Sequence, residues 1–272
     1  MPGHRQKPDV SELADESRQR AAVQGAAKKA RQEVSIVIPV MNETFSLEQT
    51  VEILLAEDRD DMAEIVLVIS PRTTPESRAV IARLIEQNPT LVWVHTQSLP
   101  YLGGALQEAF ALTRGNYTLL MASDLETDPH LVRDLIRTAR DSGADIVTAS
   151  RWIRGGGFHG YHPLKLAFNY AFQHLIGALY LTRLSDMTYG FRIFKTEVLR
   201  NVRWEEMKHP FLLETMLKPL RMGRTVKEIP VQWEPRQEGE SQIRFATYYG
   251  YMRIAAKVRV RRRSRLSNGA AA

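Results

Sequence analysis

The stretch YTLLMASDLETDPHLVRDLIRTARDSGADIVTAS, residues 117–150, decides the fold class. An apolar run over 117–122 leads into an acidic loop, then into a helix-period segment over 129–141 with proline in its first turn. A second apolar run follows over 145–150. A strand, a crossover helix of about a dozen residues and another strand form the unit that gives parallel pairing. The stretch therefore predicts an α/β fold.

The same alternation extends outward in both directions. Before this unit, the pattern predicts strands over 34–40, 64–69 and 91–95 and helices over 46–57, 75–87 and 103–113, with Ser46 as a helix cap and Gln49 three residues on. After it come a long apolar helix over 163–182, a turn and strand over 186–194, a helix over 210–222, a strand over 225–231 and a helix over 245–260. We expect a Rossmann-like, mostly parallel central sheet flanked by helices in one domain, 33–244. A polar extension, 1–32, would precede it, and a basic helix and tail, 245–272, would follow.

The composition is that of an ordinary globular protein without cysteine. The chain has 272 residues, 44% of them hydrophobic and 25% charged, which are ordinary globular values. It has no cysteine, which excludes disulfides and thiolate metal sites, and no apolar stretch before Val34 that would serve as a secretory signal.

The net charge of +6 is unevenly distributed. Residues 241–272 hold eight Lys and Arg and no Asp or Glu, so subtracting these eight charges from +6 leaves −2 for the rest. A basic tail is typical of proteins that bind an anionic membrane surface or a nucleic acid, or it is simply solvated. No nucleic acid is expected, because no recognised reading motif is present. Tyr248, Tyr249 and Tyr251 are expected to add anchoring at a membrane interface.

Ligands of open parallel sheets bind outside the carboxyl ends of the strands. There, Asp124 and Glu126 are two residues apart and share a face if the backbone is extended. Carboxylate oxygens suit Mg²⁺, which uses one or two of them together with substrate phosphates. Asp128, directly before Pro129, is interpreted as a helix cap. After the next strand, Arg151 and the glycines at 155–157 suit a phosphate.

The apolar helix predicted over 163–182 approaches the length of a membrane span. His162, Lys165, Asn169 and Gln173 recur every three or four residues and therefore line one face. A lysine near the middle of a span costs roughly 2.5–3.5 kcal/mol, so we do not expect a span. A helix at a membrane interface or over a site fits the pattern better, and an ordinary buried helix with a polar edge is the alternative.

The order of these motifs resembles family-2 glycosyltransferases. Pro-x-x-Asn-Glu at 39–43 is similar to the opening of that family, Gly-Gly-Ala at 103–105 to its third-helix loop, and 122–126 to the position of its Asp-x-Asp metal motif. Ser-Arg-Trp at 150–152, the glycines at 155–157, DMTYGFR at 186–192 and Arg-x-x-Gly-x-Ser at 236–241 closely resemble dolichyl-phosphate mannose synthases and related polyprenyl-phosphate glycosyltransferases. The resemblance covers about Val34 to Arg244.

The resemblance implies a GT-A fold, a GDP- or UDP-linked sugar donor and Mg²⁺ or Mn²⁺ held by Asp124 and Glu126. It implies that Arg151, Lys165 and Asn169 hold the acceptor phosphate, and that Asp124, Asp186 and Arg236 are the catalytic residues, with Arg236 closing over the donor phosphates. The residues implied for donor binding are Pro39, Asn42, Glu43, Ser70, Gly103, Ser123, Asp124 and Arg236. The expected location is the cytoplasmic face of a membrane, with peripheral attachment.

Several positions depart from the family pattern. Ala122 replaces the first Asp of the metal motif, Ile69-Ser70 replaces an acidic pair after the second strand, and Gln242 replaces a Lys. Lys165 stands in place of Arg and Asn169 in place of Ser.

Our leading hypothesis is inverting transfer of a hexose, of the mannose or glucose type, to a polyprenyl phosphate. This acceptor is already ionised at neutral pH and needs no strong base. Three alternatives stay open. A hydroxyl acceptor on a sugar or natural product would need a base, with Asp186 or Glu214 as the candidate. The departures from the family pattern also allow a non-catalytic homologue that only binds its ligands. The third alternative is a protein that binds nucleic acid through the basic tail.

Overall fold

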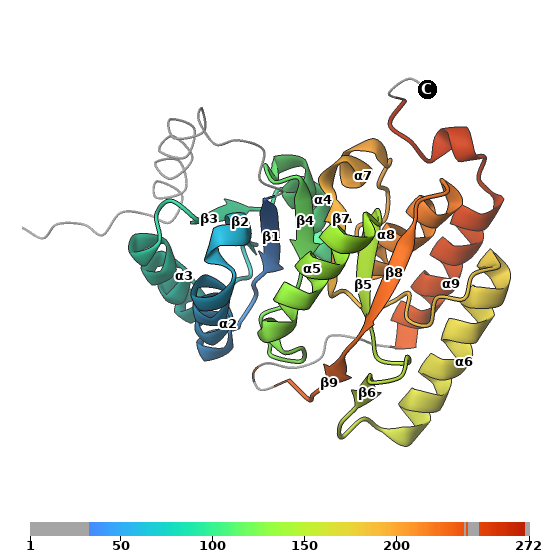
Figure 1. Ribbon diagram of the computed structural model, residues 1–272, viewed down its shortest axis with the longest axis horizontal. Helices are drawn as coiled ribbons and strands as arrows, with labels where there is room; N and C mark the ends of the chain where they lie inside the picture. Colours follow the sequence, from blue (N-terminus) through green and yellow to red (C-terminus); the bar gives the residue numbers. More distant parts are fainter. Residues whose placement is uncertain (1–32, 237, 239–244, 270–272) are drawn as a thin grey trace, which may run out of the picture.

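A seven-stranded sheet organises the part of the chain that the computed structural model describes, residues 33–236, 238 and 245–269 (Figure 1). Its strands, in the order β3-β2-β1-β4-β7-β5-β8, are β1 (Val34–Pro39), β2 (Met62–Ile69), β3 (Val92–Thr96), β4 (Tyr117–Leu120), β5 (Ile146–Ser150), β7 (Arg192–Lys195) and β8 (Val226–Pro230). Only β7 runs antiparallel to its neighbours, β4 and β5. The other pairs are parallel, which confirms the predicted mostly parallel sheet.

Helices cover both faces of this sheet. They are α2 (Phe45–Glu57), α3 (Pro75–Gln87), α4 (Tyr101–Leu112), α5 (Val132–Ser142), α6 (Pro163–Tyr180), α7 (Thr196–Asn201), α8 (Phe211–Arg221) and α9 (Phe245–Val260). Ile36 and Ile38 of β1 pack in a core cluster with α2, α3 and α5, and Val37 packs in a second cluster with α4, α8 and α9. Side chains alternate between the faces of a strand, so a strand covered on both faces reads as a continuous apolar run.

The boundaries of most elements lie within a few residues of those predicted, and α3 and α9 have the predicted bounds. The assignment of Ser46 as a helix cap was wrong. Helix α2 begins at Phe45 after Thr44, and Ser46 lies buried inside its first turn. Only the end of 186–194 is strand, because β7 begins at Arg192. The polar extension 1–32 and the motif residues Gly239, Ser241 and Gln242 lie outside the described residues.

Helix α9 packs into the domain instead of standing apart from it. Its residues Tyr251, Ile254 and Val258 are buried in the second core cluster. Tyr251 is therefore a core residue, and the prediction that it anchors the protein at an interface was wrong. Its ring meets Phe172 of α6 at a centroid distance of 5.8 Å.

A second, two-stranded sheet lies at the end of the molecule where the parallel strands finish. It pairs β6 (Gly157–Phe158) with β9 (Gln232–Trp233), below the carboxyl ends of β5 and β8 and beside the first turn of α6 (Figure 1). The sequence stretches after β1, β4, β5 and β8, which are far apart in the chain, therefore reach one edge. No helix among the described residues has the length and apolar character needed to cross a bilayer.

Candidate active site

Asp124 and Glu126 stand on a tight turn after β4. Leu125, between them, has a φ of 58°, in the left-handed region that a branched residue rarely adopts. The turn lets the Glu126 N–H donate to Asp124 Oδ1 at 3.2 Å. The two carboxylates do lie close together, as the sequence predicted, but through this turn and not through extended backbone.

Arg236 brings a positive charge to both carboxylates from the far end of the chain. Its Nη2 lies 3.2 Å from Asp124 Oδ2 and 2.8 Å from Glu126 Oε1, and its Nε donates to Glu126 Oε1 at 2.9 Å. Trp233 of β9 donates from Nε1 to Glu126 Oε2 at 3.2 Å. Three of the residues proposed from the sequence for metal and donor binding thus meet at one point.

The charge at this point is negative overall. Burial and the neighbouring Glu126 carboxylate together raise the pKa of Asp124 to about 6, against the opposing effect of Arg236. Glu43 adds to the rise, although its own carboxylate turns back to accept the N–H groups of Met41 at 2.7 Å and Asn42 at 3.0 Å. A cation of higher charge than a guanidinium would be stabilised here.

Asp124 and Glu126 fit a hard divalent cation. Their oxygens converge on one nitrogen of Arg236, and carboxylate oxygens are the ligands such ions prefer. Among the described residues no group of three or more His, Cys, Asp or Glu side chains is arranged to hold a metal. The remaining ligands would have to come from a bound phosphate or from water.

Glu238 ties the segment that carries Arg236 to the start of α2. Its carboxylate accepts the N–H and the hydroxyl of Thr44 at 2.7 and 2.5 Å, and those of Ser46 at 3.2 and 2.8 Å. These bonds satisfy N–H groups that the first turn of a helix leaves without partners. Sequence reasoning missed Glu238, because nothing local links it to a helix that begins almost two hundred residues earlier.

Two of the residues proposed for donor binding take part in the protein's own structure. Ser70 lies in a turn, where its N–H donates to Thr73 Oγ1 at 3.0 Å and its hydroxyl accepts the Arg72 N–H at 3.1 Å. A Cβ at Gly103 would overlap the backbone of Glu206 and Met207, so glycine is needed there for close packing. Ser123 is fully buried, and its hydroxyl has no hydrogen-bond partner among the described residues.

Arg151 does not present a free guanidinium. It forms a two-pronged ion pair with Asp186, Nε to Oδ2 at 2.7 Å and Nη2 to Oδ1 at 3.0 Å, and both side chains are buried. The guanidinium carbon also lies 5.0 Å from the ring centroid of Phe158 and 4.4 Å from that of Tyr189. Arg151, which the resemblance assigned to acceptor binding, and Asp186, which it assigned to catalysis, are therefore bonded to each other.

The polar side of α6 faces this ion pair. Gln173, almost fully buried, donates from Nε2 to Asp186 Oδ1 at 3.3 Å, to Thr188 Oγ1 at 2.8 Å and to Asn169 Oδ1 at 3.1 Å. Lys165, in the first turn of the helix, is exposed and makes no side-chain hydrogen bond or ion pair with a described residue. The structure therefore connects Asn169 to the Asp186 segment and leaves Lys165 available to an incoming anion.

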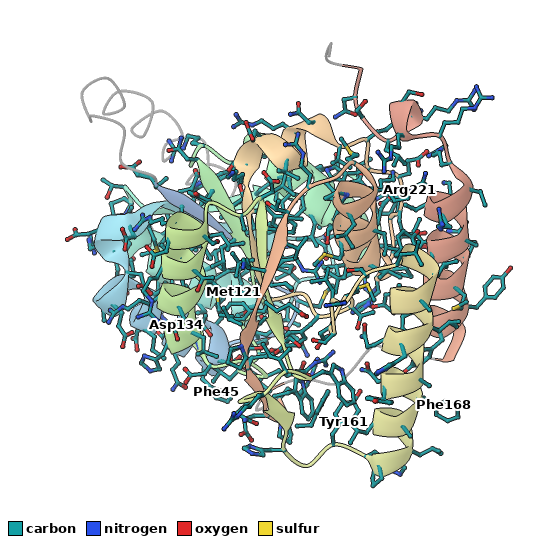
Figure 2. All side chains as sticks on the ribbon, turned by 45° about the vertical axis from the view of Figure 1, so that its right-hand side comes forward. Phe45, Met121, Asp134, Tyr161, Phe168 and Arg221 are labelled. Atoms are coloured by element: carbon teal, nitrogen blue, oxygen red, sulfur yellow. The ribbon has the colours of Figure 1, made fainter. Side chains whose placement is uncertain are left out.

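Three large apolar residues of α6 face outward. Leu164, Phe168 and Leu175 recur at helical spacing and are 60%, 58% and 52% exposed, and Figure 2 shows Phe168 pointing away from the domain. Tyr161, just before the helix, lies at the same lower edge as Phe45 of α2 in Figure 2. Gln173 and Asn169 of this helix thus point toward the ion pair and Ile176 is buried in the second core cluster, while Leu164, Phe168 and Leu175 stay exposed.

Glu214, the second residue considered as a base, is a structural residue of α8. It is fully buried, lies 2.7 Å from Lys218 Nζ and accepts the N–H groups of Glu205 and Glu206 at 3.3 and 2.9 Å. These contacts engage both carboxylate oxygens in holding Lys218 and the 205–206 segment.

Comparison with known sequences gives consistent matches. The pattern of the family described as Glycosyl transferase family 2 matches residues 35–203. The chain is 29% identical over 224 residues to glycosyltransferase AglD of Haloferax volcanii, covering 80% of this chain and 35% of that protein. It is 25% identical to an undecaprenyl-phosphate mannosyltransferase of Micrococcus luteus, covering 77% of this chain and 87% of the relative. It is also 26% identical to a dolichol-phosphate mannosyltransferase of Pyrococcus furiosus, covering 81% and 62%.

Solved structures share the fold. Glucosyl-3-phosphoglycerate synthase from Mycobacterium tuberculosis, in complex with Mn²⁺, UDP and phosphoglyceric acid, superposes with a TM-score of 0.65 at 16% identity, covering 94% of this chain and 84% of that one. A complex of the same protein with Mg²⁺ and UDP gives a TM-score of 0.63 at 17% identity, covering 94% and 84%.

The chain spans about a third of the length of the Haloferax relative and less than two thirds of the Pyrococcus one.

Proposed function

The chain belongs to glycosyl transferase family 2, and we propose that this GT-A glycosyltransferase moves a hexose from a nucleoside diphosphate sugar to a polyprenyl phosphate, with inversion. The orientation of α6 carries the proposal. Its polar residues Asn169 and Gln173 face the candidate site, and its apolar residues Leu164, Phe168 and Leu175 are exposed on the outside. An acceptor with a charged head and a long apolar chain matches both faces of one helix. The names of the Micrococcus and Pyrococcus relatives support the same acceptor class.

The residues divide between the two substrates. Asp124 and Glu126 would hold Mg²⁺ or Mn²⁺, which supplies positive charge against the leaving diphosphate. Arg236 binds the donor phosphates from the side of β9, and the loops that follow β1 and β4 receive the nucleoside end. Lys165 and Asn169 bind the acceptor phosphate, whose ionised oxygen attacks the sugar without help from a base. Catalysis then rests on alignment of that oxygen with the sugar carbon.

A hydroxyl acceptor is less compatible with this geometry. It would need a base, and Asp186 is fully buried and engaged by Arg151. Both carboxylate oxygens of Asp186 bond the guanidinium, so the side chain is not presented to an acceptor hydroxyl.

The test is a transfer assay with labelled GDP-mannose, GDP-glucose or UDP-glucose, a short polyprenyl phosphate and Mn²⁺. We expect label to enter the organic phase with at least one donor, and to stay in water when the phosphate is replaced by the free polyprenol. Transfer to water-soluble sugars in place of the lipid would contradict the acceptor assignment. Absence of both transfer and donor hydrolysis with every donor would favour the non-catalytic alternative.

We propose further that the protein attaches peripherally to the cytoplasmic face of a membrane through α6 and α9. In addition to the exposed apolar residues of α6, Tyr249 of α9 is 75% exposed. The basic residues of α9 and the tail fall into two groups. Arg253, Lys257 and Arg261 lie on Glu205 or Glu206 within the domain, and Arg262, Arg263 and Arg265 are exposed. Each basic residue near an anionic surface is worth about 1 kcal/mol, an attraction that salt screens.

Flotation with anionic vesicles tests this attachment. The triple variant Leu164→Ser, Phe168→Ser, Leu175→Ser is expected to weaken binding at least about tenfold at low and high salt, because apolar surface no longer enters the bilayer. Neutralising Arg262, Arg263 and Arg265 with glutamine should remove only the salt-sensitive part. Leu112→Ser, on an exposed apolar residue of α4, is the control and should float like the wild type. A wild-type protein that stays behind at low salt would contradict the proposal.

A further inference from the structure

The point where Asp124 and Glu126 converge is filled by the protein itself. One nitrogen of Arg236, Nη2, lies between the two carboxylates at 3.2 and 2.8 Å. A Mg²⁺ ion held by the same oxygens would lie about 2.0–2.1 Å from them. The guanidinium and the ion therefore compete for one position, and both cannot contact the same oxygens at once.

Several contacts keep the Arg236 side chain in this place. The backbone N–H of Glu234 donates to the Glu126 carbonyl at 3.1 Å, and the Trp233 indole bonds the Glu126 side chain. On the other side of Arg236, Glu238 accepts the four bonds from Thr44 and Ser46. The segment is held both before and after Arg236, which raises the local concentration of its guanidinium at the carboxylates.

The charges favour exchange of the guanidinium for a cation. Three carboxylates, Asp124, Glu126 and Glu43, influence this point, and Arg236 offers a single positive charge. A divalent ion balances more of that charge, and the guanidinium it displaces becomes free to bind an anion such as a diphosphate.

We propose that Arg236 is the resident counter-ion of the Asp124–Glu126 pair, that a divalent cation binds by displacing it, and that Glu238 is the positioning residue that sets the strength of this competition. The inference rests on the metal site of the proposed function and goes beyond it, because it orders the events. The cation enters first and releases Arg236, and the diphosphate then receives a guanidinium that was not available before.

The test measures binding of Mn²⁺ alone, without donor, by calorimetry. Arg236→Lys keeps the charge but loses the planar fork, and we expect it to bind Mn²⁺ at least about fivefold more tightly than the wild type, and Arg236→Ala at least about tenfold. Glu238→Ala should tighten Mn²⁺ a few-fold, although it removes a negative charge, and should have no such effect in an Arg236→Ala background. Arg154→Ala, on an exposed arginine of the loop after β5, is the control for a general charge effect.

A second measurement needs no variant. Titration of the wild type with Mg²⁺ should shift the Nε–H NMR signal of Arg236, assigned by its loss in Arg236→Lys, and leave that of Arg154 in place. Unchanged Mn²⁺ affinity in Arg236→Lys, or an unmoved Arg236 signal at saturating Mg²⁺, would overturn the inference while leaving the metal site intact. No Mn²⁺ binding in the wild type or in any variant would instead remove the metal site from the proposed function.

Discussion

Asp124→Asn is expected to lower kcat for sugar transfer by on the order of 10²–10³-fold, measured with saturating donor, acceptor and Mn²⁺. Asp124 occupies the position that the family resemblance assigns to an aspartate of the metal motif, and its loss leaves Glu126 as the single carboxylate on Arg236 Nη2. Effects of this size are typical when one preorganised electrostatic group is removed from a site where charge develops.

The loss of activity should not come from unfolding. Burial raises the pKa of Asp124 to about 6, so at neutral pH the folded protein holds an ionised group whose charge its surroundings disfavour. Removing that charge should leave thermal stability equal or higher, as is common for functional residues.

Asp128→Ala is the matched control for Asp124→Asn. Asp128 Oδ1 accepts the His130 N–H at 3.0 Å and caps the short helix that precedes α5, as the sequence predicted. We expect a loss of about 1 kcal/mol in the free energy of unfolding and an unchanged kcat. Full activity in Asp124→Asn would refute the metal-site assignment.

Arg151→Ala is expected to lower the free energy of unfolding by about 3–5 kcal/mol, because it leaves Asp186 buried without its ionic partner. Denaturant unfolding at neutral pH measures this loss. Replacing both partners, Arg151→Met with Asp186→Leu, should recover part of the stability, since no unpaired charge then remains inside. The double variant should stay inactive if Asp186 also orients a substrate.

Lys165→Ala is the contrasting substitution. Lys165 is exposed, so we expect unchanged stability and an acceptor KM about tenfold higher, with the donor KM unaffected. Lys227→Ala, on an exposed lysine of β8, should change neither constant. An Arg151→Ala variant as stable as the wild type, with a raised acceptor KM, would instead support the phosphate-binding role that the sequence suggested for Arg151.

The sequence by itself determined the family, the fold class and the edge of the sheet at which the motifs meet. Apolar periodicity records which side of each element avoids water, and this information is local. It was sufficient to predict the bounds of α3 and α9, the parallel strands and the helix cap at Asp128. The roles of the site residues remain predictions.

Only the tertiary structure decided which partners these residues have. Strand β7 inserts antiparallel between β4 and β5, and the buried bond between Arg151 and Asp186 follows from their meeting at the end of β5. Asp124 faces Arg236 because Leu125 adopts a left-handed turn and the chain after β9 returns to the same edge. Such pairings join residues far apart in the chain, and their energies depend on burial and distance, which composition and spacing do not encode. The sequence shows where the charged residues are. Only the folded structure shows whether a charged side chain already pairs with another residue of the protein.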